Sequence, residues 1–234
     1  MKYQHIFFDL DHTLWDFDRN ARLVLVSMYQ NFLKGQGFSQ QQFIDVYEQV
    51  NRSLWDQFNH GQLDKQQLRA IRFSETFRQL GVNEGHFELT PIAMDEWYLH
   101  HCAEMDGVFP GCYECLDILQ QYFHLHLITN GFTETQYKKM ASAKLTHYFE
   151  QVFVSDEVGA HKPDPAIFEY AMQAVHTVPE ACLMVGDSLL ADIEGAKRAG
   201  IDQVWFNPNH QPSLQSMTYQ IQQLLELPTL LGVR

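Results

Sequence analysis

Five short apolar runs recur along the 234-residue chain, each with the length and composition of a buried strand. They lie at residues 6–8, 125–128, 152–154, 183–185 and 204–206. Stretches with helical periodicity separate most of them. Strands that alternate with helices usually pair in parallel and are covered on both faces. The spacing therefore predicts an α/β fold built on a parallel sheet.

The alternation is interrupted between residues 16 and 105, where helical patterns follow one another without a strand. Residues 39–42 have the pattern of a capping box, and residues 64–67 open a second helix in the same way. Thr90-Pro91 opens a third, with proline at the first helical position. This part of the chain is therefore expected to be all-helical.

We accordingly expect two domains. Residues 1–15 and 106–234 would form the α/β core, a Rossmann-like doubly wound parallel sheet, and residues 16–105 would form an inserted all-helical cap. An insert directly after the first strand would sit over the crevice in which open α/β sheets bind ligands.

Further helix boundaries are readable in the sequence. One helix is expected from Arg19 to Lys34, ending before Gly35. Residues 133–136 resemble another capping box, directly after the second apolar run. Asp164-Pro165 has the pattern of an N-cap followed by proline at the first helical position.

The charge of the chain excludes some partners. The formal net charge is −13, and no cluster of lysine and arginine offsets it, so nucleic-acid binding is not expected. No segment approaches the roughly 20 apolar residues of a membrane span. The apolar run near the N-terminus is too short for a signal peptide. We therefore expect a cytoplasmic protein with no membrane partner, either a monomer or a homodimer.

Two of the four cysteines, Cys112 and Cys115, have the spacing of a redox or metal-binding pair. No second pair or histidine cluster completes a zinc site. Both follow Pro110-Gly111 at an expected helix start, where residues three apart share a face. We interpret them as small apolar residues of that helix.

Polar side chains follow several of the expected strands, at the point where each strand ends. Because the carboxyl ends of parallel strands meet at one edge of the sheet, these side chains should lie close together. Lys162, from a loop that follows another strand, is expected to join them. The residues at the strand ends are Asp9, Asp11, Thr129, Asn130, Asp187 and Ser188.

This set of side chains suits phosphoryl transfer. Carboxylates gathered at one place repel one another and need a cation, and oxygen ligands favour a hard ion such as Mg²⁺. Lys162 adds a positive charge, and Thr129 and Asn130 add hydrogen-bond donors. Of the paired acids, one can bind the metal and attack phosphorus, while the other can keep a higher pKa for proton transfer.

The same residues resemble the motifs of the haloacid dehalogenase-like hydrolase superfamily over nearly the whole chain. Residues 9–13, with the sequence Asp-Leu-Asp-His-Thr, resemble its first motif, and Thr129-Asn130 its second. Lys162-Pro163 resembles the third, and residues 186–188 with Asp192 the fourth. The predicted helical insert lies where this family carries a cap.

The resemblance implies a role for each of these residues. Asp9 would attack the phosphate, and Asp11 would protonate the leaving group and then activate water. Mg²⁺ would be held by the side chains of Asp9 and Asp187 and by the backbone carbonyl of Asp11. The remaining members would support the metal from outside (Asp192, Ser188), hold the phosphate (Thr129, Asn130) and offset negative charge (Lys162).

A finer resemblance is to pyrimidine 5′-nucleotidases of the house-cleaning type, which hydrolyse UMP, dUMP, dTMP and non-standard pyrimidine nucleoside monophosphates. It rests on residues 7–15, 51–55, 128–132 and 157–159. Trp15 is the expected substrate contact, because it is the aromatic residue nearest the catalytic loop. Asp11 argues against the dehalogenases, which lack this second acid.

Two alternatives remain open at this stage. One is another enzyme of the same fold, either a sugar-phosphate phosphatase or a mutase similar to β-phosphoglucomutase. The other is a non-catalytic binding protein, although such a protein would be expected to lose Asp9, Asp11 or Lys162.

Overall fold

The computed structural model describes residues 2–82, 85 and 87–234. The chain divides into two compact units. The first consists of Met1–Phe17 with Asp106–Arg234, and the second consists of Asp18–Met105. We propose that the second unit is the cap expected from the sequence.

The first unit contains a six-stranded sheet in which every neighbouring pair is parallel, in the order β3-β2-β1-β4-β5-β6. From β1 the chain winds to one side through β2 and β3, then returns to the other side with β4, as in a doubly wound sheet. The strands are β1 (His5–Phe8), β2 (His124–Thr129), β3 (Gln151–Val154), β4 (Cys182–Gly186), β5 (Asp202–Phe206) and β6 (Tyr219–Ile221). The predicted fold class is confirmed.

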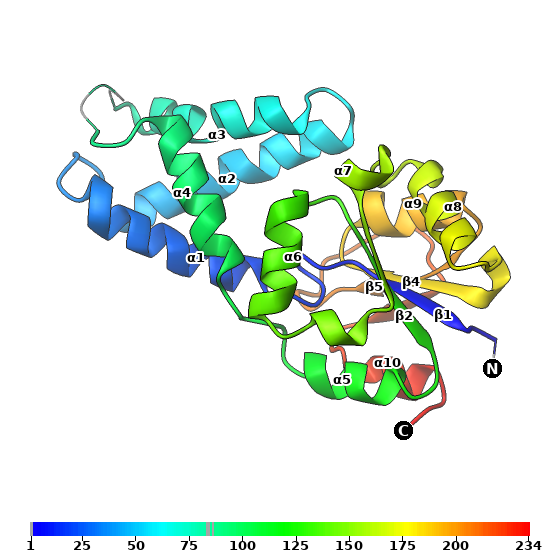
Figure 1. Cartoon of the computed structure of the whole chain (residues 1–234). Helices are drawn as coiled ribbons and strands as arrows, with labels where there is room; N and C mark the ends of the chain where they lie inside the picture. The colour runs from blue at the N-terminus through cyan, green and yellow to red at the C-terminus, as the bar shows by residue number, and fades with distance from the viewer. Residues whose placement is uncertain (1, 83–84, 86) are drawn as a thin grey trace. The chain divides into compact units, whose positions relative to one another are not determined.

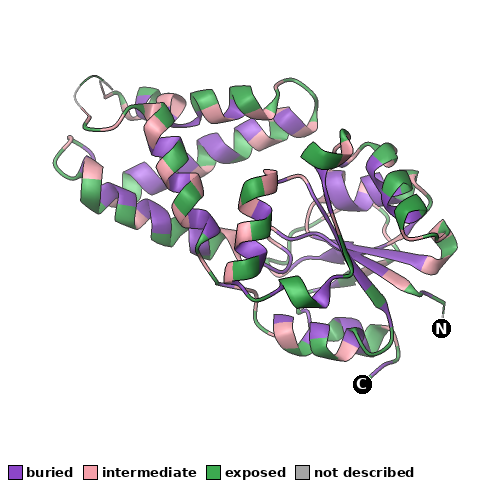
Figure 2. Ribbon diagram, in the orientation of Figure 1, coloured by how far each residue is buried: buried purple, intermediate pink, exposed green. Residues whose placement is uncertain are grey.

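Helices cover both faces of this sheet (Figure 1). Helices α5 (Cys112–Leu119) and α10 (Glu226–Leu230) lie on one side, and α8 (Pro165–Ala174) and α9 (Gly195–Arg198) on the other. The strands are buried along most of their length (Figure 2). The remaining elements are α6 (Thr133–Ser142), α7 (Ser155–Val158), the 3₁₀ turns Thr146–Tyr148 and Pro179–Ala181, and the π-helical turn Leu189–Glu194 that leads into α9.

One helix start in this unit differs from the prediction. The capping box expected at residues 133–136 is wrong, because α6 begins at Thr133 with no side-chain cap. The side chain of Gln136 does not turn back to the helix start and instead donates a hydrogen bond to Asp11. A tertiary contact therefore replaces the local one.

The second unit is all-helical. It contains α1 (Phe17–Met28), which continues as the π-helical turn Tyr29–Leu33, then α2 (Gln40–Asn59), α3 (Lys65–Leu80) and α4 (Pro91–Ala103). Capping boxes are present at Ser39 and Asp64, as predicted. The helix expected over residues 19–34 begins two residues earlier and changes from α to π geometry in its last part.

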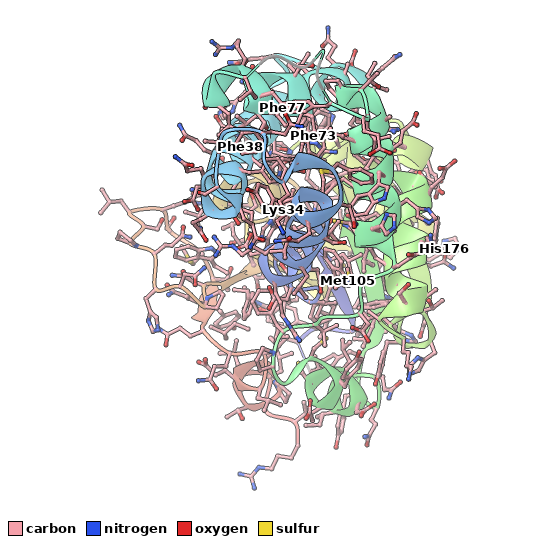
Figure 3. All side chains as sticks on the ribbon, turned by 90° about the vertical axis from the view of Figure 1, so that its left-hand side faces the viewer. Lys34, Phe38, Phe73, Phe77, Met105 and His176 are labelled. Carbon is pink, nitrogen blue, oxygen red and sulfur yellow. The ribbon has the colours of Figure 1, made fainter. Side chains whose placement is uncertain are left out.

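The helical unit is held together largely by aromatic packing. Phe43 of α2 stacks on Phe77 of α3 with ring centroids 6.3 Å apart, and Phe73 lies 5.1 Å from Tyr47. Figure 3 shows Phe38, Phe73 and Phe77 within this unit. Aromatic pairs at such distances add to the stabilisation gained from burying their area.

All four cysteines are free and buried. Cys112 and Cys115 lie in α5, and burial raises the pKa of the Cys115 thiol to about 12. Neither thiol is therefore poised as a thiolate, which agrees with their interpretation as apolar helix residues. Among the described residues, no helix is long and apolar enough to cross a membrane.

A buried ion pair stabilises the helical unit. The guanidinium of Arg72 on α3 donates to the carboxylate of Asp95 on α4 through Nε (2.9 Å) and Nη2. Both side chains are about 2% exposed. Arg72 also donates to Asn51 on α2 (3.2 Å), so the pair joins three helices.

Replacing Arg72 with methionine is expected to lower the free energy of unfolding of the helical unit by about 3 kcal/mol. The substitution leaves the Asp95 carboxylate buried, with Arg69 as its remaining partner at 3.1 Å. Urea denaturation followed by tryptophan fluorescence measures the change. The matched control is Arg78→Met on the same helix, which removes only an exposed pair with Glu75. Equal effects of the two variants would contradict the importance of burial.

Candidate active site

The candidate site lies where the winding of the sheet changes direction. Strands β1 and β4 are neighbours, with Phe8 opposite Val185, and the chain turns to opposite sides from them. Asp9 follows β1 directly, and Asp187 follows β4. Open α/β sheets bind their ligands in the crevice at this position, so the topology alone brings these two carboxylates to the expected place.

A buried ammonium joins two of the acids. Nζ of Lys162 donates to Oδ1 of Asp9 (2.6 Å) and to Oδ1 of Asp192 (2.7 Å). Its third partner is the backbone carbonyl of Ile128, at 2.8 Å. Lys162 is 2% exposed, Asp9 7% and Asp192 1%. All three ammonium donors are therefore used inside the protein, and the lysine is fixed in position.

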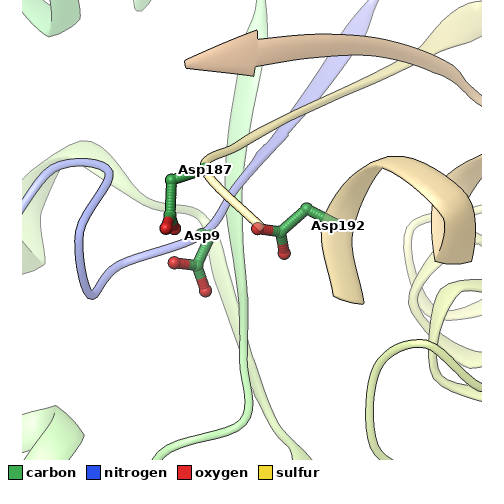
Figure 4. A group of neighbouring side chains, drawn as sticks. All are labelled: Asp9, Asp187 and Asp192. Atoms are coloured by element: carbon green, nitrogen blue, oxygen red, sulfur yellow. The ribbon is translucent and has the colours of Figure 1, made fainter. Parts of the chain in front are cut away.

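The carboxylates of Asp9, Asp187 and Asp192 come together from three segments of the chain (Figure 4). One oxygen from each lies within 4.8 Å of the others. Oδ2 of Asp192 accepts a hydrogen bond from the backbone N–H of Ser188 (2.9 Å), so both its oxygens already have partners. The Asp192 carboxylate is therefore less available to a metal than those of Asp9 and Asp187.

Two small residues shape this part of the site. Thr13 donates its hydroxyl to Oδ1 of Asp187 at 3.3 Å, and Ser188 caps the following turn by accepting from the N–H of Ala191 at 3.1 Å. At Gly186 an added Cβ would lie 2.3 Å from the carboxyl carbon of Asp192. The close approach of Asp192 therefore requires glycine at this position.

The residues after β2 hold the loop that carries Lys162. The side chain of Asn130 accepts from the N–H of Lys162 (2.9 Å) and donates to its carbonyl oxygen (2.8 Å). Thr129 accepts from the N–H of Gly131 at 3.2 Å. The peptide bond between Lys162 and Pro163 is cis. In this structure the amide side chain of Asn130 is thus a support for the lysine loop.

Burial and mutual repulsion raise the pKa values of two acids of the cluster, Asp9 and Asp187. Burial raises the pKa of Asp9 well above its usual range; Lys162 partly opposes this shift, and Asp192 and Asp187 add to it. Burial and the nearby Asp192 raise the pKa of Asp187 to about 8. Burial alone would lower the pKa of Lys162, but Asp192 and Asp9 outweigh it and the pKa is raised.

These features fit a hard divalent cation. The donors are all oxygens and they converge, and the raised pKa values of Asp9 and Asp187 indicate that one lysine does not neutralise the cluster. A bound cation would lower those pKa values by direct attraction. Oxygen-only donors favour Mg²⁺ or a similar ion over softer metals.

Asp11 belongs to a neighbouring group of side chains. Its Oδ2 accepts from the Gln136 amide (2.8 Å) and its Oδ1 from the Lys139 ammonium (2.7 Å). Burial pushes its pKa upward, but Lys139 and Gln136 outweigh burial, and the pKa of Asp11 is lowered. The sequence led us to expect a higher pKa at Asp11, and the structure shows the opposite because Lys139 lies beside it.

Gln136 and Lys139 were missed in the sequence. They are three residues apart, so they share one face of a helix that begins just after a strand end. Two polar residues with this spacing, on a helix next to the edge of the sheet that carries the site, could have indicated a contact with the site. The local capping pattern instead places Gln136 at the helix start, and no local pattern points to Lys139.

Trp15 is fully buried. Its ring faces the ammonium of Lys139 at 4.4 Å and packs edge-on against Phe17, with centroids 5.9 Å apart. In this arrangement Trp15 contributes to the environment of Lys139. The expectation that it contacts the substrate stays a prediction.

The comparisons with known proteins agree on one family. The family model described as haloacid dehalogenase-like hydrolase matches residues 6–206. The chain is 34% identical to the pyrimidine 5′-nucleotidase PynA of Streptococcus pneumoniae, covering 94% of this chain and 93% of that protein. It is 33% identical to the pyrimidine 5′-nucleotidase YjjG of Escherichia coli, covering 99% of both.

A solved structure leads to the same family. The HAD-hydrolase YfnB of Bacillus subtilis, whose crystals contain bound magnesium, superimposes with a TM-score of 0.89 at 29% identity. The alignment covers 99% of this chain and all of that one. With the family model matching most of its length, the chain belongs to the haloacid dehalogenase-like hydrolases.

Proposed function

We propose that this chain is a Mg²⁺-dependent 5′-nucleotidase that hydrolyses pyrimidine nucleoside monophosphates through an aspartyl-phosphate on Asp9. At the coarser level the chain is a phosphoric monoester hydrolase. The observation that carries the proposal is the position of Asp9. It follows β1 at the switch point of the sheet, 2.6 Å from the Lys162 ammonium and beside Asp187.

In the first half-reaction, a carboxylate oxygen of Asp9 attacks phosphorus while the bond from phosphorus to the ester oxygen breaks. Asp11 must hold a proton for this step, which it has to take up against the lowering of its pKa by Lys139. The leaving oxygen takes that proton from Asp11 and departs as the nucleoside hydroxyl. Lys162 keeps its proton and offsets negative charge on Asp9 and on the phosphoryl group. This charge needs compensation because the site is buried.

In the second half-reaction, water attacks the phosphorus of the aspartyl-phosphate. Asp11, now a carboxylate, takes a proton from that water, and the bond between Asp9 and phosphorus breaks. Inorganic phosphate leaves, and both aspartates return to their starting states. One acid–base residue serves both steps because the first step leaves it in the form that the second requires.

We assign the metal to the side chains of Asp9 and Asp187 and to the backbone carbonyl of Asp11. Asp192 and Ser188 support it from outside, Asp192 through its bonds to Lys162 and to the N–H of Ser188. When bound, Mg²⁺ would supply positive charge to the phosphate oxygens and keep the aspartates ionised. Thr129 and the Asn130 backbone amide are assigned to the phosphate.

The substrate class rests on the relatives. PynA and YjjG are both pyrimidine 5′-nucleotidases, and each aligns with this chain over nearly its whole length. The matched region includes the helical unit. We therefore assign UMP, dUMP, dTMP and related non-standard nucleotides as substrates.

A panel of phosphate esters tests this assignment. With Mg²⁺, phosphate release from UMP, dUMP and dTMP is expected to exceed release from AMP, GMP and sugar phosphates by at least about tenfold in kcat/KM. A malachite-green assay at several substrate concentrations measures it. A preference for sugar phosphates would retain the chemistry and remove the nucleotide assignment. Interconversion of sugar phosphates without phosphate release would indicate a mutase.

A further inference from the structure

Both oxygens of the Asp11 carboxylate are held by one helix. Gln136 and Lys139 reach Asp11 from the same face of α6, at 2.8 Å and 2.7 Å. Asp9 is held separately by Lys162, which comes from a different loop. The structure thus provides a separate ammonium for each of the two aspartates of the first motif.

Gln136 is in an energetically costly position. It is fully buried, and its carbonyl oxygen makes no hydrogen bond within the described part of the chain. Burying a polar atom without a partner is energetically unfavourable. Its side chain also fills the space beside Gly131, where an added Cβ would lie 1.4 Å from Nε2 of Gln136. The interaction that this position of Gln136 makes possible is the hydrogen bond to Asp11.

Lys139 is enclosed as well. It is 6% exposed, and its ammonium lies 4.4 Å from the ring of Trp15 and 5.5 Å from the ring of Phe17. The aromatic faces attract the ammonium and limit its movement. Within the part of the chain that the structure describes, the ion-pair partner of Lys139 is the Asp11 carboxylate. Trp15 and Phe17 thereby restrain the position of the Lys139 ammonium that donates to Asp11.

We propose that Gln136 and Lys139 are positioning residues that fix the orientation of the Asp11 carboxylate for proton transfer. The inference rests on the proposed function, in which Asp11 serves the leaving group and the attacking water. Proton transfer requires the acid within hydrogen-bond reach of the reacting oxygen, and a displacement of about 1 Å can cost on the order of 100-fold in rate.

The alternative is that these contacts only anchor α6 to the rest of the unit. The leaving group separates the two roles. The p-nitrophenolate ion departs without a proton, whereas the ribose oxygen of a nucleotide needs one. A defect in Asp11 positioning should therefore lower kcat/KM for a nucleotide much more than for p-nitrophenyl phosphate. General loss of structure would lower both.

The test compares UMP with p-nitrophenyl phosphate for wild type, Lys139→Met and Gln136→Leu. For UMP, kcat/KM is expected to fall by about 10- to 100-fold through kcat, with KM changed by less than about twofold. For p-nitrophenyl phosphate, kcat/KM is expected to fall by less than about threefold. Lys138→Met removes the same charge from the neighbouring position of α6 and should match wild type on both substrates.

Two more variants guard against misfolding. Gly131→Ala should displace the flexible Gln136 side chain and reproduce the substrate pattern of Gln136→Leu. Lys139→Arg keeps a cationic donor and should recover a large part of the activity on UMP. Equal losses on both substrates, or a fall in Tm with unchanged substrate preference, would overturn the positioning role.

The same assay distinguishes failure of the proposed function from failure of the inference. A wild-type protein that releases phosphate from neither substrate, or an Asp11→Asn variant whose kcat/KM falls equally for both substrates, would overturn the proposed mechanism and the inference with it. If Asp11→Asn lowers kcat/KM for UMP but not for p-nitrophenyl phosphate, while Lys139→Met and Gln136→Leu match wild type, only the inference is overturned.

Discussion

Replacing Asp9 with asparagine is expected to lower kcat for every phosphomonoester by at least about 10⁴-fold, because a neutral amide does not attack phosphorus. Loss of the covalent intermediate should accompany the loss of turnover. A brief reaction with ³²P-labelled substrate, stopped in acid, should label the wild-type protein and should not label the variant. Asp11→Asn should retain more label than wild type, since it slows release.

The Asp9→Asn protein should still fold. The Lys162 ammonium keeps Asp192 and the Ile128 carbonyl as partners. Burial already disfavours the charged form of Asp9, whose pKa is raised, so a neutral side chain of the same shape is tolerated there. A thermal melt should place its Tm at or above that of the cation-free wild type.

The matched control is Asp202→Asn. Asp202 begins β5, at the edge of the sheet opposite the site, where it binds Lys2 and Tyr3. This variant should keep wild-type turnover. Full activity in a purified Asp9→Asn protein would instead mean that another group forms the bond to phosphorus.

The strands that the sequence revealed are those with a continuous run of apolar, largely buried side chains. Residues 183–185 lie in β4, between β1 and β5, and every residue of that strand is buried. Strand β6 was not predicted. It is three residues long, lies at the edge of the sheet and includes one exposed side chain, so it has no continuous apolar run.

The site was predictable as far as it depends on topology. Asp9, Asp187 and Lys162 could be grouped because parallel strands bring their carboxyl ends to one edge. The partners of Asp11 could not be identified in this way, since they depend on how α6 is rotated against that edge. Residues 133–136 satisfied a local capping rule, and only packing decided that Gln136 turns to Asp11.

Trp15 and Asn51 illustrate the same limit. Both residue types suit a nucleobase, and their positions in the sequence do not exclude that role. In the structure, Trp15 faces Lys139, and the Asn51 side-chain oxygen accepts from the buried Arg72. Aromatic and amide side chains serve packing and recognition equally well, so the surroundings of each residue decide between the two.

Removing divalent cations is expected to stop turnover, and adding Mg²⁺ back should restore it. In the cation-free protein the carboxylates of Asp9 and Asp187 repel each other inside a buried site, and both have raised pKa values. Treatment with EDTA followed by titration with Mg²⁺, measuring release of phosphate from UMP, tests this. A rate indifferent to the chelator would remove the metal from the mechanism.

The same ion should stabilise the fold, and more strongly at pH 8 than at pH 6. The pKa of Asp187 is raised from 3.8 to about 8, so the folded protein holds a proton there that the unfolded chain releases above pH 4. That contribution to stability is complete below pH 4 and is lost as the pH rises through about 8. Mg²⁺ competes with this proton, so the rise in Tm on adding Mg²⁺ should increase with pH. Asp187→Asn should lose the rise at both pH values, whereas Asp202→Asn should keep it; a rise independent of pH would place the cation away from Asp187.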